Sequence, residues 1–250
     1  MAKDHYTGFW VDWYDELSGG SLHDIELFRD LLRCSGQPIL ELACGTGRML
    51  IEFLKDGMVL DGVDLAPAMI TQCQAKLDKA GLRSNLYIQS ITDLALPGKY
   101  KTIFITGSSF QHISTPEEAM KALVCIFNHL EPGGKFLIDI FIPFDDILDP
   151  SHDQLIERWS ASRGNMQLKV KKSSDFDFRK QTDHHTYIYE LYENDKLIRS
   201  EEDHVEVKWY GVKEFELMLE QAGFSDITSK ALDVGSSGRI ITLHTAYKIN

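Results

Sequence analysis

A short apolar strand that runs directly into a glycine-rich turn and a helix constrains this chain more than any other feature. Residues 39–50 read ILELACGTGRML, and the two glycines, Gly45 and Gly47, let the backbone approach a ligand closely. The helix that follows presents free N–H groups and partial positive charge at its start. Asp64 ends the next apolar strand, 19 residues after Gly45, where a carboxylate reaches the ribose hydroxyls of a bound nucleotide. The spacing therefore predicts a nucleotide-binding strand–helix–strand unit.

Apolar strand segments and helical segments alternate along the rest of the chain. The helical patterns cover residues 48–57, 67–81, 116–130 and 212–224. The strand segments are 38–43, 58–64, 85–90, 100–106, 135–142, 226–234 and 239–248. Only residues 235–238, GSSG, separate the last two, which is room for a hairpin but not for a crossover helix. The pattern predicts an α/β fold: a doubly wound, seven-stranded, mostly parallel sheet whose last strand is antiparallel.

The sequence divides into three parts of different character. Residues 1–37 predict a helical N-terminal lid, and residues 38–145 together with 210–250 predict the nucleotide-binding domain. Between them, residues 146–209 alternate apolar and polar side chains in MQLKVKK, HHTYIYELYE and DHVEVKWY, which is typical of antiparallel strands. We expect an antiparallel β insertion of about three strands that forms the acceptor side of the site.

The residues around the glycine turn distinguish between two classes of nucleotide. A dinucleotide fingerprint requires a third glycine at position 50, where this chain has Leu50. Glu41 lies inside the strand, where an unpaired carboxylate is unfavourable and where a pyrophosphate is a poor neighbour. The ammonium of S-adenosylmethionine (SAM) matches that carboxylate, so the motif favours SAM over a nicotinamide dinucleotide.

Several segments resemble class I, Rossmann-like SAM-dependent methyltransferases of the small-molecule type. The resemblance is carried by ExxCGTGR at the turn, by GVDLAPAMI after it, and by YIQSITDLAL, TGSSFQHI and HLEPGGKFLIDIFIP further along. These segments span residues 39–143 in the expected order, and WYGVKEFELMLEQAGF resembles the helix before the closing hairpin. The resemblance implies SAM as cofactor and S-adenosylhomocysteine as product.

The resemblance also implies a role for individual residues in cofactor binding. The backbone around Cys44 holds the amino-acid part of SAM, Asp64 holds both ribose hydroxyls, and Met69 packs on the adenine. Ser90 stands where the family usually carries an aspartate that meets the adenine amino group. The full set of expected cofactor-binding residues is Tyr14, Glu41, Ala43, Cys44, Gly45, Gly47, Asp64, Leu65, Met69, Ser90, Ile91 and Thr106.

The segment TGSSFQHI, residues 106–113, follows the fourth strand at the edge where open α/β sheets bind ligands. It resembles the GNSFAHL-type turn of glycine N-methyltransferases, with Ser108 in place of the asparagine, and it lacks the D/N-P-P-Y/F signature of enzymes that methylate nucleic-acid bases. His112 is its one titratable side chain and could take a proton from an acceptor. The alternative is that His112 only shapes the turn. Ser108 and Phe110 are the other expected acceptor contacts of this segment.

Aromatic residues gather near the N-terminus in FWVDWYDEL. On one helix, Trp10, Trp13 and Tyr14 would share a face by their i, i+3, i+4 spacing. That face either packs into the core or forms a lid, because aromatic faces suit the positive sulfonium of SAM. Sugar-amine N-methyltransferases have a similar Tyr-Asp that meets the SAM carboxylate, which singles out Tyr14. We expect Trp10, Trp13 and Trp209 to contact the acceptor.

Charge and composition exclude several classes of partner. The formal net charge of −12 disfavours binding to a phosphate backbone, and we expect Lys169, Lys171 and Lys172 to decorate the solvent face of a strand. The four cysteines form no cluster and the adjacent His184 and His185 point to opposite faces of a strand, so we expect no metal. No apolar run approaches the roughly 18 to 20 residues of a membrane helix. Residues 1–20 have neither the basic nor the apolar region of a signal peptide, so we expect none. We expect a cytoplasmic monomer or homodimer without nucleic-acid or membrane partners.

Together these patterns predict a SAM-dependent methyltransferase that acts on a small molecule, with nitrogen favoured over oxygen as the methyl acceptor. Two alternatives stay open at this point. One is a SAM-binding scaffold or regulatory protein without its own catalysis, because the binding motif would be the same. The other is an NAD-dependent oxidoreductase, which Leu50 and the closing hairpin oppose.

Overall fold

The strand segments assemble into one seven-stranded sheet in the computed structural model, which describes residues 8–17, 22–234 and 239–249. The strands are β1 (Ile39–Leu42), β2 (Leu60–Asp64), β3 (Leu86–Ile88), β4 (Tyr100–Ile105), β5 (Leu130–Ile140), β10 (Ser225–Val234) and β11 (Arg239–Tyr247). Their order is β10-β11-β5-β4-β1-β2-β3, and β11 runs antiparallel to both of its neighbours. The predicted fold is confirmed, although the hairpin residues 235–238 lie outside the described part of the chain.

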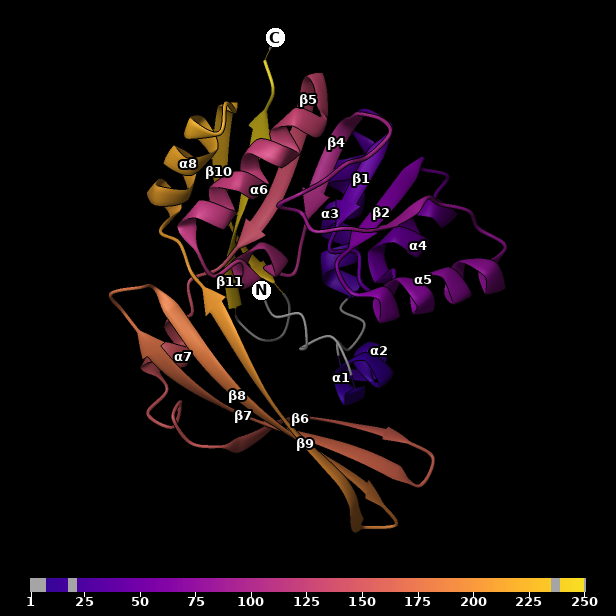
Figure 1. Cartoon of the computed structure of the whole chain (residues 1–250), viewed down its shortest axis with the longest axis vertical. Coiled ribbons are helices and arrows are strands. Elements are labelled where there is room, and N and C mark those ends of the chain that lie inside the picture. The colour runs from indigo at the N-terminus through magenta and orange to yellow at the C-terminus, as the bar shows by residue number, and fades with distance from the viewer. Residues whose placement is uncertain (1–7, 18–21, 235–238, 250) are drawn as a thin grey trace.

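Helices cover both faces of this sheet, as the alternation of strands and helices predicts (Figure 1). They are α3 (Leu22–Arg33), α4 (Arg48–Lys55), α5 (Pro67–Ala80), α6 (Pro116–His129) and α8 (Val212–Gln221). Side chains of successive strand residues point to opposite faces, so in β4 Ile103 and Ile105 join the core under α6 and α8. Phe104 joins the core under α3, α4 and α5. Burial on both faces explains why these strands are almost continuously apolar.

The insertion forms a separate antiparallel sheet of four strands in sequential order. A short helix, α7 (Phe144–Leu148), leads into β6 (Ile156–Arg163), β7 (Met166–Asp177), β8 (Thr182–Glu193) and β9 (Lys196–Lys208). These long strands extend away from the main sheet in Figure 1. The sequence predicts about three strands because β6 has a single buried residue, Ala161, and therefore no apolar alternation to detect.

The described N-terminal segment packs against the insertion rather than standing apart from it. It consists of α1 (Gly8–Asp12) and α2 (Tyr14–Leu17), and Phe9 and Trp13 are buried against side chains of β7, β8 and β9. Gln72 of α5 donates to the carbonyl of Val11 over 3.0 Å, which ties the segment to the nucleotide-binding domain as well. None of the helices in the described residues is long and apolar enough to cross a membrane.

One buried histidine links the stability of this fold to pH. His244 of β11 is fully buried, its ring centre lies 5.0 Å from that of Phe215, and its Nδ1 is 2.8 Å from the hydroxyl of Ser229. Burial lowers the pKa of His244 to about 4, although the nearby Glu216 acts in the opposite direction. The folded state therefore resists protonation of this ring, whereas the unfolded chain takes up the proton near pH 6.5.

We expect the free energy of unfolding to fall as the pH drops from about 6.5 to about 4, by up to about 1.4 kcal/mol per pH unit from this one group. The unfolded state binds more protons in that window, so acid favours unfolding. Urea denaturation at several pH values measures the slope, which we expect to be shallower in His244→Gln. His204→Gln, at an exposed position, is the matched control and keeps the wild-type slope. Equal slopes in all three proteins contradict the prediction.

Candidate cofactor and acceptor site

The turn after β1 has a backbone that favours glycine. Gly45 and Gly47 have φ of 55° and 82°, and Ala43 adopts the same left-handed region at 54°. A Cβ at Gly47 would lie 2.5 Å from the sulfur of Cys73, so a larger residue there would require the Cys73 side chain to shift. Helix α4 begins at the next residue, Arg48. The turn therefore brings backbone N–H groups to the carboxyl edge of the sheet at the start of a helix.

Asp64 fixes the position of this turn. One carboxylate oxygen accepts from the N–H of Gly45 and the other from the N–H of Ala66, both over 2.8 Å. The carboxylate thus bridges the loops that follow β1 and β2. Burial raises the pKa of Asp64, and the backbone donors counteract that rise.

A cavity opens above the turn, and most of the expected cofactor residues line it. From the sequence-predicted set these are Tyr14, Ala43, Gly45, Asp64, Leu65, Met69, Ser90 and Ile91. The sequence did not identify Gln89, Thr92, Ser109 and Ile113, which also line it. These residues follow β3 or belong to the turn after β4. Only their position after a strand could have marked them as candidates in the sequence. A carboxylate beside apolar walls fits a nucleoside with a flat base.

Four of the expected cofactor residues do not line this cavity: Glu41, Cys44, Gly47 and Thr106. Glu41 is buried beneath the turn, and burial raises the pKa of its carboxyl well above the ordinary value. Its Oε2 has no hydrogen-bond partner among the described residues. Burial favours the neutral carboxyl, whereas a cationic ligand group beside it would favour the carboxylate, so the role of Glu41 in cofactor binding stays a prediction.

A second cavity, of about 490 Å³, lies on the other side of the turn after β4. The nucleotide-binding domain contributes Ser108, His112 and Phe141 to its lining, and the N-terminal segment contributes Trp10. The insertion contributes Arg158, Trp159, Lys172, His185 and Tyr187. His112 ends the short 3₁₀ helix η1 (Ser109–His112) and lines both cavities.

Buried hydrogen bonds hold the segment that carries His112. Asp139 of β5 accepts from the N–H groups of Gly107 and Ser108 over 3.1 and 2.9 Å. The fully buried amide of Gln111 donates to the carbonyls of Phe141 and Lys208 and accepts from the N–H of Phe141. The Asp139 carboxylate and the Gln111 amide are both buried and have hydrogen-bond partners, so they fix the position of His112 between the cavities.

Three expected acceptor contacts line neither cavity. Trp13 is packed in the core of the insertion, with the Arg163 guanidinium 4.4 Å from its ring centre. The N–H of Trp13 donates to the carbonyl of Phe9 over 3.0 Å, so Trp13 lies one helical turn after Phe9 and is buried in the same cluster. Trp10 and Tyr14 are also one turn apart, and their ring centres lie 5.8 Å from each other. Phe110 is fully buried in the domain core, and Trp209 packs against Phe176.

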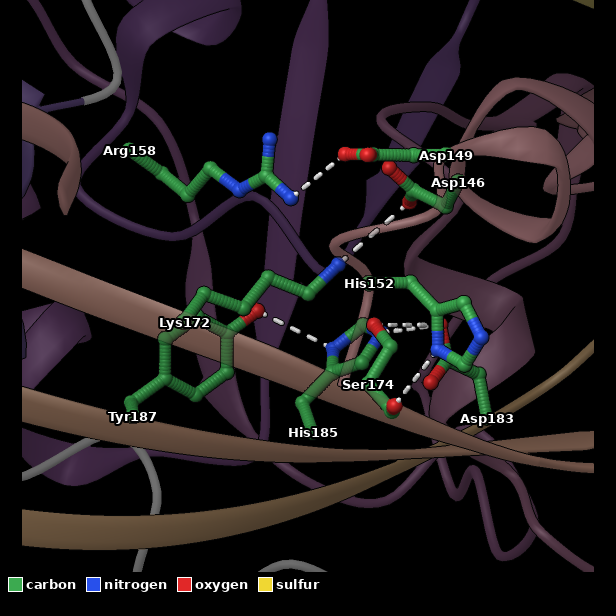
Figure 2. A network of polar contacts seen from close by, with 9 residues as sticks. All are labelled: Asp146, Asp149, His152, Arg158, Lys172, Ser174, Asp183, His185 and Tyr187. Carbon is green, nitrogen blue, oxygen red and sulfur yellow. Dashed lines mark hydrogen bonds and ion pairs between the residues drawn. The ribbon is translucent and has the colours of Figure 1, made fainter. Parts of the chain in front are cut away.

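The inner face of the insertion carries a polar network that faces the second cavity (Figure 2). Lys172 donates to Asp146 over 3.4 Å, and Arg158 donates to Asp149 over 2.9 Å. The expected solvent position is wrong for Lys172, whose side chain is only 11% exposed. It follows Leu168 and Val170 at a spacing of two and so shares their inner face.

The same two-residue alternation governs the histidine pair. His184 is exposed on the outer face of β8 and His185 is buried on the inner face. Among the residues that the structure describes, no three His, Cys, Asp or Glu side chains are grouped as a metal site.

Comparison with known proteins shows similarity to methyltransferases. Residues 39–134 match the family model of the methyltransferase domain. A protein of Bacillus subtilis with a provisional methyltransferase name is 25% identical over 232 residues, 88% of this chain and 86% of that protein. The dTDP-3-amino-3,4,6-trideoxy-alpha-D-glucopyranose N,N-dimethyltransferase of Streptomyces venezuelae is 31% identical over 101 residues, 40% of this chain and 41% of that protein.

A solved structure shares the fold over the whole chain. SAM-bound CalS10, an amino pentose methyltransferase from Micromonospora echinaspora, superposes with a TM-score of 0.72 at 17% identity. The superposition covers 99% of this chain and all of that one. The likeness therefore includes the insertion and the N-terminal segment as well as the nucleotide-binding domain.

Removal of the Asp64 carboxylate tests the cofactor cavity. We expect Asp64→Ala to weaken SAM binding at least about tenfold, because a hydrogen bond to a charged group contributes roughly 1.5–3 kcal/mol. Isothermal calorimetry measures the change, with Asp61→Ala, on the same strand but outside the cavity lining, as the control. Unchanged affinity in Asp64→Ala would show that SAM binds elsewhere.

Hydrogen exchange tests whether the N-terminal segment responds to the cofactor. Tyr14 lines the cofactor cavity, so we expect amide exchange across residues 8–17 to slow when SAM is added. Helix α8, which lines neither cavity, is the internal control and keeps its rates. Equal exchange of residues 8–17 with and without SAM identifies a permanently packed element instead of a lid.

Proposed function

We propose that this chain, a SAM-dependent methyltransferase with the class I fold, methylates a nitrogen of a small-molecule acceptor bound in the second cavity. The observation that carries the proposal is the position of His112, which lines both cavities. A group that passes from one ligand to the other would pass beside this side chain. The alternatives of a scaffold without catalysis and of an NAD-dependent oxidoreductase are not supported by the comparisons.

The residues that line the cofactor cavity support SAM as its ligand. Gly45 and Asp64 would hold the polar parts, Leu65 and Met69 would pack on the base, and Tyr14 would close the cavity. SAM supplies a methyl group on a cationic sulfonium, and its transfer needs an oriented lone pair and the exclusion of water. Burial raises the pKa of Tyr14, so its phenol stays protonated at neutral pH and can donate a hydrogen bond to a ligand.

The second cavity fits a small amine better than a macromolecule. Its volume of about 490 Å³ lies within the usual range of small-molecule sites. Trp10, Trp159 and Tyr187 provide aromatic faces, which attract an ammonium. The charges of Asp145 and Asp146 are balanced by Arg158 and Lys172 in the same lining, so the aromatic faces carry this argument. The amino-sugar acceptor in the name of the Streptomyces venezuelae relative supports nitrogen over oxygen.

His112 would act at the point where the two cavities meet. Its imidazole can accept a hydrogen bond from the acceptor N–H, orient the nitrogen, and take its proton as the N–C bond forms. No metal or second cofactor is needed for this assignment. The fixed position of η1, held by Gln111 and Asp139, makes such an orientation reproducible.

Substitution of His112 tests this role. We expect His112→Ala to lower kcat for methyl transfer by about 10²- to 10⁴-fold while SAM affinity stays within about twofold. Initial rates with labelled SAM are measured on two acceptor probes, glycine and dTDP-3-amino-3,4,6-trideoxy-α-D-glucopyranose. His184→Ala, at an exposed position on β8, is the control. A loss confined to acceptor KM identifies an orienting residue, and wild-type values of both constants leave His112 only a structural role.

A further inference from the structure

Three side chains on the inner face of β8 form a continuous hydrogen-bonded chain that ends at the acceptor cavity (Figure 2). Asp183 Oδ2 lies 2.6 Å from His185 Nε2, and His185 Nδ1 lies 3.0 Å from the hydroxyl of Tyr187. These residues alternate along one strand, so the period of two aligns all three on the same face. Both His185 and Tyr187 line the cavity, whereas Asp183 lies behind them and is 2% exposed.

The partners of His185 determine which of its nitrogens carries the proton. The Asp183 carboxylate accepts, so Nε2–H donates to it, and the hydroxyl of Ser174 donates to the same oxygen over 3.2 Å. In the neutral ring Nδ1 is then an acceptor, and the Tyr187 hydroxyl donates to it. The chain therefore points from the cavity toward the buried carboxylate, which is the direction a proton would travel.

Burial favours the neutral form of His185 before it receives a proton. Burial is the main cause that lowers the pKa of His185, and Lys172 on β7 lowers it further, while Asp183 and Asp146 of α7 raise it. Strand β9 places only apolar Val205 opposite His185, and Arg158 of β6 and His112 of η1 line the same cavity. An unprotonated ring with a carboxylate behind it can accept a proton and stabilise the resulting imidazolium.

We propose that the Tyr187–His185–Asp183 chain is a proton relay that converts the acceptor from an ammonium into the free amine before methyl transfer. This inference rests on the proposed function. The acceptor N–H bond breaks as a new O–H bond forms at Tyr187. The original Tyr187 O–H bond breaks as an N–H bond forms at His185 Nδ1. The acceptor loses one positive charge, His185 gains it, and Asp183 stays a carboxylate that stabilises the imidazolium.

The relay and His112 serve different protons. An ammonium has no lone pair, so one proton must leave before nitrogen can react, and the relay takes this one. His112, where the cavities meet, assists the nitrogen as the N–C bond forms. Tyr187 is thus the residue of the relay that contacts the acceptor, while His185 acts through it and Asp183 is a positioning residue.

The pH dependence of Tyr187→Phe distinguishes a relay from a structural role. We expect kcat/KM on the probe amines to fall about 10²-fold at pH 7. The deficit shrinks about tenfold per pH unit as the pH approaches the pKa of the amine, because the free amine then forms without a base. Tyr189→Phe removes a hydroxyl from a ring that stacks on Tyr187 but does not line the cavity, and this control keeps the wild-type profile.

The outcomes separate failure of the relay from failure of the proposed function. A loss in Tyr187→Phe that is the same at every pH, or no loss, overturns the relay while the wild type still methylates the probes. If the wild type binds SAM but transfers methyl to neither glycine nor dTDP-3-amino-3,4,6-trideoxy-α-D-glucopyranose, the proposed function fails and the relay fails with it.

Nitrogen-15 NMR of the histidine rings provides a readout that does not depend on activity. We expect His185 at pH 7 to be the neutral tautomer with the proton on Nε2, and Asp183→Asn to weaken that preference and reproduce the rate loss at pH 7. The same variant regains activity at high pH. A proton found on Nδ1 in the wild type reverses the direction of the Tyr187 hydrogen bond and overturns the relay.

Discussion

The amide of Gln111 connects the parts of this molecule that must act together. It is fully buried in the 3₁₀ helix η1, and its hydrogen bonds reach Phe141, just beyond β5, and Lys208, the last residue of β9. One side chain thus holds the end of β5 and the end of the inserted sheet against the turn that carries His112. A buried amide that lost these partners would be strongly unfavourable, so the position of the acceptor cavity relative to the cofactor cavity depends on this contact.

The cofactor half of the site could be predicted from the sequence because its determinants are local. The turn at Gly45 and the carboxylate of Asp64 lie within one strand–helix–strand unit, where spacing alone fixes their relation in space. The seven-stranded sheet was predictable for the same reason, since each buried strand is a continuous apolar segment. The antiparallel final strand followed from the four residues that separate it from its neighbour.

The acceptor half could not be predicted because its residues lie far apart in the sequence and none of them belongs to a recognisable motif. Lys172 and His185 follow the strand alternation, but only the pairing of β7 with β8 shows which face is turned toward His112. Trp13 and Phe110 are of residue types that often contact an acceptor, but both fill cores instead. Trp13 is buried in the same cluster as Phe9, one helical turn earlier, and Phe110 is packed in the core of the nucleotide-binding domain. Strand β6 could not be recognised because only one of its residues is buried, so its sequence has no alternation of apolar and polar residues.

This division has a consequence for how the enzyme selects its acceptor. The cofactor cavity is built mainly by loops at the edge of the parallel sheet, whereas the inner faces of β6, β7 and β8 supply the charged groups of the acceptor cavity. A substitution at Arg158 or Lys172 changes the charge that the acceptor meets without altering the glycine turn or Asp64. The relay residues differ from these two because His185 is enclosed by Asp183 and Ser174 within the sheet, where a change also leaves a buried carboxylate without its partner. Acceptor preference can therefore vary most freely at the partly exposed Arg158, whereas the less exposed Lys172 also acts on the pKa of His185 in the relay.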